Sequence, residues 1–195
     1  VAHHVVQSAG AGRFAMHDLV RGFAAASARD SDRRSDRRAA VSRLLDHYLA
    51  VAAEHMNRVD PARADQRPAI PPSPLRVDQE PKAWFDAELS NLLATAEMPI
   101  EDHDRPHYPV LLSAVIARHL TISEAYQAAV TIHERACLAA RQGGDVTGEA
   151  WSTMRRATTE LERGRYRQSL DYFDAADRLF ARSGDDVGQL RVRHY

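Results

Sequence analysis

Histidine is the residue type in this sequence with the widest chemistry, and it occurs ten times among 195 residues. His103 and His107 have the i,i+4 spacing with which two histidines on one helix bind zinc. Pro106 lies between them and would break such a helix, and no cysteine lies near enough to complete a ligand set. We therefore expect Glu101–His107 to form an exposed polar loop, and we predict no metal site.

No other pattern brings catalytic groups together. The sequence contains neither a Gly-x-Ser-x-Gly turn for a nucleophilic serine nor a Gly-x-x-x-x-Gly-Lys-Ser/Thr loop for nucleotide phosphates. Its single cysteine, Cys137, lies on an alanine-rich helical face, where a small buried residue is the ordinary interpretation. We predict no catalytic residues and no ATP hydrolysis by this chain alone, because a phosphate loop and its Mg²⁺ ligands are needed to position ATP.

The sharpest local motif is Met-His-Asp at residues 16–18, which follows two short apolar runs. Val5–Ser8 and Arg13–Met16 flank a glycine-rich turn, and this pattern predicts a β-hairpin. Asp18 is the expected N-cap of the helix that follows. A hairpin followed by a helix is the outline of a truncated winged helix, which we assign to residues 1–28. The helix carries one apolar stripe, which consists of Leu19, Val20, Phe23 and Ala24.

A helical linker is predicted for residues 29–107. In its first segment, Arg29–Arg38, positively and negatively charged side chains alternate. Because the aspartates cancel much of the arginine charge, we expect a solvated hinge rather than a phosphate site. A helix then follows, as indicated by apolar residues at helical spacing. Six of the nine prolines lie in residues 61–81 and predict an extended crossing, and the next helix begins its apolar stripe with Trp84 and Phe85.

Residues 108–195 repeat with a period of 40 residues. Tyr126 matches Tyr166, and the Gly-Asp pair that begins at Gly144 matches the pair that begins at Gly184. Each period places a helix before this pair, a short turn, and another helix after it, which is typical of an α-solenoid. The second period resembles a degenerate tetratricopeptide repeat at its turn glycine, aromatic positions and small packing position, which are Gly164, Tyr166, Phe173 and Ala176.

The helix predicted at residues 149–163 carries two neighbouring stripes. One is made of small residues suited to packing on the partner helix: Ala150, Thr153, Ala157 and Leu161. The other stripe consists of Trp151, Met154, Arg155, Thr158 and Glu162. In tetratricopeptide proteins the stripe at this position lines the concave groove. The resemblance therefore implies that these residues line a groove for a protein or peptide. The alternative is that Trp151 and Met154 belong to the core between repeats, as aromatic stripes at helical spacing usually do.

The last segment, Val187–Tyr195, has the pattern of the first helix of a further repeat. Solenoid units are stabilised by their neighbours, so Val187, Leu190 and Val192 are expected to lack part of their cover. This helix should either fray or pair with a second copy of the chain. The sequence also begins without Met and inside an apolar run, and we expect it to be a piece of a longer protein.

Two motifs carry a resemblance to a family. The Met-His-Asp motif resembles the one that closes the winged-helix part of the NB-ARC nucleotide switch in STAND regulators. Trp84-Phe85-x-x-Glu88-x-x-Asn91-Leu92 is similar to a segment downstream of that switch in actinobacterial NB-ARC–tetratricopeptide regulators, among them the large Streptomyces antibiotic regulatory proteins. The resemblance implies a cytoplasmic regulator of transcription. The parent protein would bind ATP or ADP with Mg²⁺ in its own nucleotide-binding domain, and this chain would hold no cofactor by itself.

The resemblance also implies a role for two residues. In the family, the histidine of this motif contacts the β-phosphate of bound ADP, which would be the role of His17 in the parent. Asp18 would orient His17 or cap the following helix. The alternative is that His17 is a partly buried histidine whose hydrogen bonds are satisfied by the local backbone.

The predicted fold is all-α apart from the hairpin, with a winged-helix remnant, a helical linker and a tetratricopeptide-like solenoid. The function implied is the sensory and autoinhibitory region of a STAND-type regulator, in which the solenoid receives a signal and relays it to the nucleotide switch. The alternative is a free-standing scaffold that binds a peptide without nucleotide coupling. The formal charge of −1 argues against a nucleic-acid-binding surface over the whole chain, and no apolar run is long enough for a membrane helix.

Overall fold

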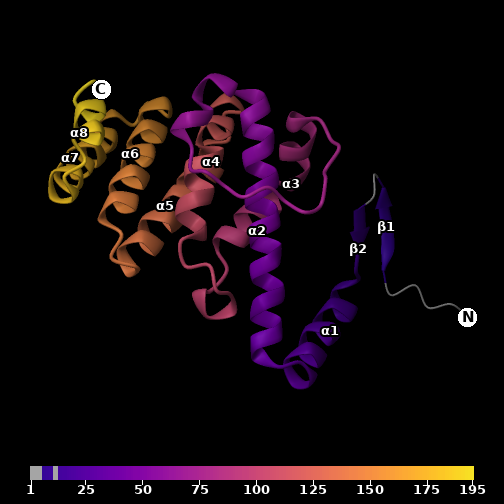
Figure 1. Ribbon diagram of the computed structural model, residues 1–195. Helices are drawn as coiled ribbons and strands as arrows, with labels where there is room; N and C mark the ends of the chain where they lie inside the picture. Colours follow the sequence, from indigo (N-terminus) through magenta and orange to yellow (C-terminus); the bar gives the residue numbers. More distant parts are fainter. Residues whose placement is uncertain (1–5, 11–12) are drawn as a thin grey trace, which may run out of the picture.

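The computed structural model describes residues 6–10 and 13–195, and within these it is all-α apart from one hairpin (Figure 1). Strand β1 (Gln7–Gly10) pairs antiparallel with β2 (Arg13–Ala15), as predicted, and the tip of the predicted turn lies outside the described residues. None of the described helices is long and apolar enough to cross a bilayer. The helices are α1 (Asp18–Ser31), α2 (Arg34–Val59), the 3-10 helix η1 (Pro61–Gln66), α3 (Pro81–Ala96), the 3-10 helix η2 (Ile100–Asp102), α4 (Tyr108–Ile122), α5 (Tyr126–Gln142), α6 (Val146–Glu162), α7 (Tyr166–Ser183) and α8 (Asp186–Val192).

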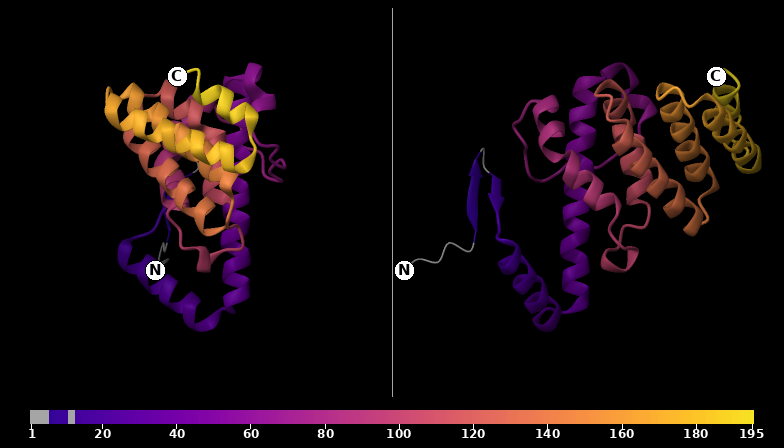
Figure 2. Two further views of the ribbon diagram at one scale, coloured as in Figure 1. Left: turned by 90° about the vertical axis from the view of Figure 1, so that its left-hand side faces the viewer. Right: turned by 180° about the vertical axis from the view of Figure 1, so that it is seen from behind.

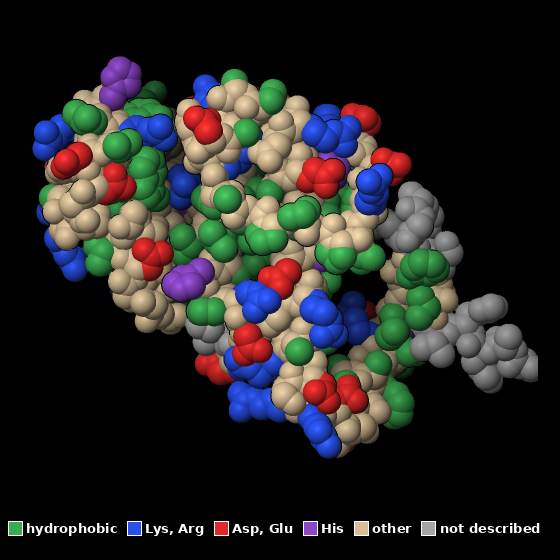
Figure 3. Space-filling model, in the orientation of Figure 1, with side chains coloured by type: hydrophobic (Ala, Val, Ile, Leu, Met, Phe, Trp, Pro, Cys, Tyr) green, Lys and Arg blue, Asp and Glu red, His purple; other side chains and the backbone are tan. Residues whose placement is uncertain are grey.

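The hairpin and α1 project from the helical body at one end of the molecule (Figure 1). The exposed hinge between α1 and α2 is confirmed, and Arg37 holds its corner by donating to the carbonyl oxygens of Ala28 and Asp32 at 3.2 and 2.6 Å. Most of the predicted apolar stripe of α1 is uncovered by the described residues, since Leu19 is 78% and Phe23 75% exposed, whereas Val20 is half-buried. Figure 3 shows hydrophobic side chains gathered on this projecting end.

The larger hydrophobic core joins α2, α3, α4 and α5. Phe85 is fully buried at its centre, stacked on the ring of His119 with centroids 4.0 Å apart and edge-on to Trp84 at 5.0 Å. This core extends from Leu45 to Ile132, so the boundary predicted between residues 107 and 108 falls inside it. The segment predicted as a linker is therefore packed into the body of the protein.

The extended crossing predicted for residues 61–81 is wrong for Pro61–Gln66, which forms η1. The segment between η1 and α3 contains no helix or strand and crosses α2, as predicted. Ile70 and Val77 pack against the larger core, and Ser73 Oγ lies 2.8 Å from His47 Nδ1 of α2 in a hydrogen bond. The crossing is thereby held against the long helix.

The expectation of an exposed loop at Glu101–His107 is wrong for His103, which is buried. Its Nδ1 accepts from the backbone N–H of Arg105 at 3.1 Å, and its carbonyl accepts from Arg38 Nη2 at 2.8 Å. Arg38 extends from α2 and draws this backbone inward, and burial lowers the pKa of His103 below its ordinary value. His107, in contrast, is exposed at the start of α4, so the two histidines do not share one face.

The C-terminal half consists of helix pairs, α4 with α5 and α6 with α7, followed by α8 (Figure 2). The 40-residue period is confirmed by its turns. Gly144 and Gly184 have left-handed φ angles of 71° and 69°, which glycine adopts without strain. The aspartate that follows each glycine then caps the next helix, accepting at 2.8 Å from the backbone N–H of Gly148 or Gly188.

A second, smaller core holds α6, α7 and α8 together. Val187 and Leu190 are 64% and 69% exposed, as expected for the last helix. The expectation is wrong for Val192, which is buried in this core, because Tyr195 folds back and stacks on Phe173 at 4.9 Å. The last helix is therefore docked along one side.

Gly188 lies against Phe180 in that docking without room for a side chain, and replacing it should release α8. A Cβ at this position would lie 2.3 Å from Cδ1 of the fully buried Phe180, so Gly188→Ala is expected to cost about 1–3 kcal/mol of packing. Hydrogen exchange of residues 187–195 should then approach random-coil rates. Gly22→Ala is the matched control, because nothing lies within 4 Å of its added Cβ. Unchanged protection in Gly188→Ala would contradict this packing.

Candidate functional site

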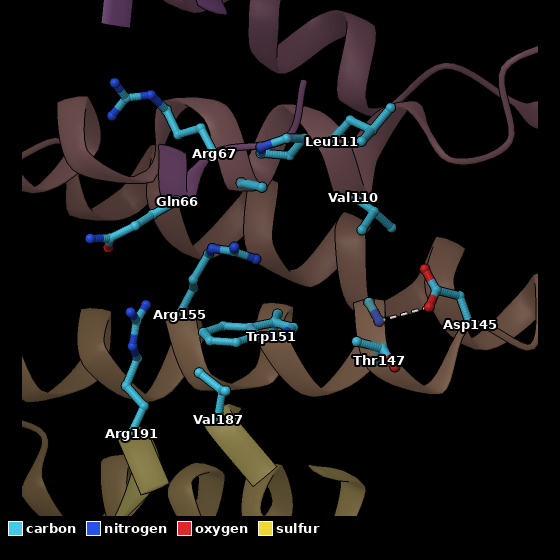
Figure 4. A pocket seen from close by; sticks show the side chains of 13 residues that line it. Gln66, Arg67, Val110, Leu111, Asp145, Thr147, Trp151, Arg155, Val187 and Arg191 are labelled. Carbon is cyan, nitrogen blue, oxygen red and sulfur yellow. Dashed lines mark hydrogen bonds between the residues drawn. The ribbon is translucent and has the colours of Figure 1, made fainter. Parts of the chain in front are cut away.

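A groove runs along the first helices of the successive pairs. Helix α4 contacts α6, and α6 contacts α8, while η1 forms the opposite wall. The groove holds two cavities of about 600 and 440 Å³, and both are lined by Gln66, Arg155 and Arg191. We call this surface the α4–α6–α8 groove, and Figure 4 shows its larger cavity. The other residues of that cavity are Arg67, Pro68, Val110, Leu111, Ala114, Asp145, Thr147, Gly148, Trp151 and Val187.

Four of the five residues predicted to line a groove border these cavities. Trp151 and Arg155 line the larger one, and Met154, Arg155 and Thr158 line the smaller one. Glu162 is exposed and borders neither cavity. The alternative role in the core also holds in part, because Met154 is buried in the smaller core.

Trp151 is held in one orientation. Its Nε1 donates to Asp185 Oδ2 at 2.9 Å, and its ring packs edge-on against Phe180 at 5.0 Å. The other carboxylate oxygen of Asp185 caps α8 through the N–H of Gly188. One aspartate thus fixes both the indole and the last helix.

Two arginines approach the Trp151 ring. The Cζ atoms of Arg155 and Arg191 lie 5.9 and 5.2 Å from its centroid, within range of a cation–π contact. Neither guanidinium has a carboxylate or hydrogen-bond partner among the described residues. Burial lowers the pKa of Arg155 to about 10, and the charge of Arg191 acts in the same direction. Arg155 therefore stays charged at pH 7.

The other charged groups of the larger cavity already have partners among the described residues. Arg67 donates to Asn57 Oδ1 and to the carbonyl of Asp60, and Arg63 pairs with the Asp60 carboxylate at 3.1 Å. Asp145 lies at the far end of the larger cavity from Arg191 and caps α6 (Figure 4). The uncompensated positive charge of this cavity therefore lies around Trp151.

The smaller cavity reaches a buried histidine. His133 is 2% exposed, and its Nδ1 shares a 2.8 Å hydrogen bond with Ser113 Oγ. Burial lowers the pKa of His133 to about 3, with the charges of Arg155 and Arg156 adding to the effect. The imidazole is therefore neutral at pH 7 and adds no charge to the groove.

Sequence reasoning missed Leu111 and Arg191 as groove residues, although the repeat contains the signal. Both lie one period, 40 residues, from Trp151, and all three line the same cavity. Extending the predicted stripe by one period in each direction would have found them. The contribution of Gln66 from η1 had no such signal, because it comes from outside the repeat.

The structure places the Met-His-Asp motif far from the groove, at the projecting end (Figure 1). The expectation that Asp18 caps α1 is wrong: His17 is the N-cap, and its Nδ1 accepts from the N–H of Leu19 at 3.3 Å. Asp18 begins the helix and pairs with Arg21 at 2.7 Å. His17 is exposed rather than partly buried, although a local backbone N–H does satisfy its Nδ1.

Comparison with known proteins gives one local relationship. No protein-family model and no solved structure matches the chain. Over 53 residues it is 53% identical to "Regulatory protein AfsR" of Streptomyces coelicolor, and this alignment covers 25% of the chain. The same alignment covers only 5% of that protein's length. Over this quarter of its length, the chain is similar to a bacterial regulatory protein.

Proposed function

We propose that this chain is the signal-receiving region of a STAND-type regulator. In this proposal the tetratricopeptide-like helix pairs bind a protein or peptide in the α4–α6–α8 groove, and the segment around His17 contacts ADP in a nucleotide-binding domain of the parent protein. The observation that carries the proposal is the preformed groove with two unpaired arginines beside Trp151. The similarity to a regulatory protein supports the regulatory role at a coarse level.

The geometry of His17 supports a contact with phosphate. Because Nδ1 accepts a hydrogen bond from the backbone, a neutral imidazole carries its proton on Nε2. That N–H belongs to an exposed side chain and can donate to a phosphate oxygen. The uncovered apolar face of α1, with Leu19 and Phe23, is where the nucleotide-binding domain would pack. The parent would supply the phosphate loop and Mg²⁺, since this sequence has no such loop.

Replacing His17 tests the coupling in a parent protein that contains a nucleotide-binding domain. His17→Ala is expected to speed ADP dissociation tenfold or more and to raise regulator activity, because a hydrogen bond to a charged group contributes about 1.5–3 kcal/mol. His17→Asn is the matched control, since asparagine keeps an N-cap acceptor but cannot reproduce the reach of Nε2. It should release ADP almost as fast as His17→Ala. ADP release is measured with a fluorescent analogue, and activity with a transcription reporter.

Two results would contradict the coupling. Normal ADP release in both variants would make His17 a surface residue without nucleotide contact. Normal release in His17→Asn with rapid release in His17→Ala would assign His17 to helix capping alone. Either result would favour the alternative, a scaffold that uses the same groove and has no nucleotide switch.

A further inference from the structure

The arginines of α6 differ in how their charge is compensated. Arg156 donates to Tyr172 Oη at 2.6 Å and lies 3.8 Å from Glu134, and Arg163 pairs with Glu160 at 3.0 Å. Arg155, on the same helix, has no anionic partner among the described residues, although it is half-buried beside a cavity. Arg191 approaches the Trp151 ring from α8, and it also has no anionic partner among the described residues.

Arg155 and Arg191 carry like charges on facing helices and repel each other, and neither has an ion-pair partner of its own among the described residues. An anion between the two guanidinium groups would remove this repulsion and form charge-assisted hydrogen bonds in a partly desolvated site. The guanidinium fork fits a carboxylate with two parallel hydrogen bonds. The indole of Trp151, fixed by Asp185, would form the wall of this subsite.

We propose that the gap between Arg155 and Arg191 binds an aspartate or glutamate carboxylate of an acidic peptide segment in a partner protein. This inference rests on the proposed function of the groove as a peptide site. It adds the chemistry of the ligand, which no relative or family supplies.

The local charge favours a carboxylate over a phosphate. The Asp185 carboxylate accepts from Trp151 Nε1, so one negative charge already lies at the edge of the ring that the two arginines approach. Two positive charges and one negative charge leave a net charge of about +1 around the indole, which matches one carboxylate. A phosphate dianion would exceed this charge and would be repelled by Asp185 more strongly than a carboxylate.

The rest of the groove suits a peptide with apolar residues next to the acidic one. Val110, Leu111 and Val187 border the larger cavity beyond Trp151, and Val187 is 64% exposed. Gln66 lies on the opposite wall and has both a donor and an acceptor for a peptide backbone (Figure 4). Figure 3 shows basic side chains in the crevice between the C-terminal helices and the body.

Selection from a random library of short displayed peptides tests the proposal on the chain as it is. Peptides retained by the unchanged chain should be enriched in Asp and Glu next to apolar residues. The enrichment should disappear with Arg155→Gln/Arg191→Gln and persist with Arg178→Gln, which removes an exposed arginine of α7 outside the groove. Arg191→Gln alone changes an exposed residue and keeps the test valid if the double variant fails to fold.

A selected peptide can then be used to measure the binding affinity and to locate the binding site. Replacing its acidic residues by Asn and Gln should weaken binding tenfold or more. Binding should also change the emission of Trp151, which is readily followed because the only other tryptophan, Trp84, is buried in the larger core. Loss of this emission change in the double variant would place the carboxylate at the two arginines.

The outcomes separate this inference from the proposed function. Retained peptides without acidic enrichment, which still bind the double variant, would leave a peptide groove and overturn the carboxylate subsite. Tighter binding of phosphoserine versions than of the acidic peptides would overturn the choice of a carboxylate. No retained peptides at all would overturn both the subsite and the groove as a peptide site.

Discussion

Lowering the pH from 7 to 5 is expected to reduce the free energy of unfolding by about 2 kcal/mol through His133 alone. In the folded chain, burial lowers the pKa of His133 from 6.5 to about 3, so the imidazole stays neutral. In the unfolded chain the same side chain takes up a proton below pH 6.5. The unfolded state therefore binds more protons, and stability that is present above pH 6.5 is lost as the pH falls towards 3, at about 1.4 kcal/mol per pH unit.

Other buried histidines act in the same direction. Burial is the main cause that lowers the pKa of His55, His103 and His119. Neither ring nitrogen of His55 has a hydrogen-bond partner among the described residues, so none of these residues offers an acceptor that would stabilise its protonated form. Their losses add to that of His133, and the larger core should be the part that weakens in acid.

Urea denaturation at a series of pH values measures this effect. His133→Gln keeps a side chain that can bond Ser113 Oγ and cannot be protonated, so it should remove about 2 kcal/mol of the loss between pH 7 and 5. His194→Gln, which changes an exposed histidine, is the matched control variant. An unchanged profile in His133→Gln would show that this histidine does not titrate as its burial requires.

The repeat was the most predictable part of the fold because local rules determine it. A left-handed glycine ends one helix and the aspartate after it caps the next, and both roles depend on residues within a few positions of each other. The stripe beginning at Trp84 and Phe85 was predictable for the same reason, since a buried helix face follows from spacing. Its polar residues also have a structural role: Glu88 accepts from Tyr48 of α2 and from Asn91.

The errors arose where distant segments meet or where two neighbours compete for one role. His103 is buried because Arg38, distant in sequence, bonds the loop backbone, and no local pattern contains that contact. Asp18 and His17 both have acceptor atoms suited to a cap, and the extended ψ angle of 140° at His17 places the imidazole there. The positive charge of the groove could not be predicted either, because the sequence does not show which arginines form ion pairs or hydrogen bonds in the fold.

Replacing Phe85 by alanine is expected to reduce the free energy of unfolding by about 3–5 kcal/mol. The side chain is fully buried and contacts the rings of Trp84 and His119, so its removal loses burial and leaves a cavity that the helices cannot fill. Phe85→Leu keeps most of the volume and should cost less than about 1.5 kcal/mol. Chemical denaturation at pH 7.5 measures both losses, and a loss below about 1 kcal/mol in Phe85→Ala would contradict the packing.

The same variant should also weaken the response to acid. The stacked Phe85 ring covers the His119 imidazole, and burial is the main cause that lowers the pKa of His119. A cavity beside His119 reduces that desolvation and moves its pKa back towards the ordinary value. Because the folded and unfolded states then differ less in proton binding, Phe85→Ala should lose less stability between pH 7 and 5 than the unchanged chain. Equal losses would mean that Phe85 packs against His119 without controlling its protonation.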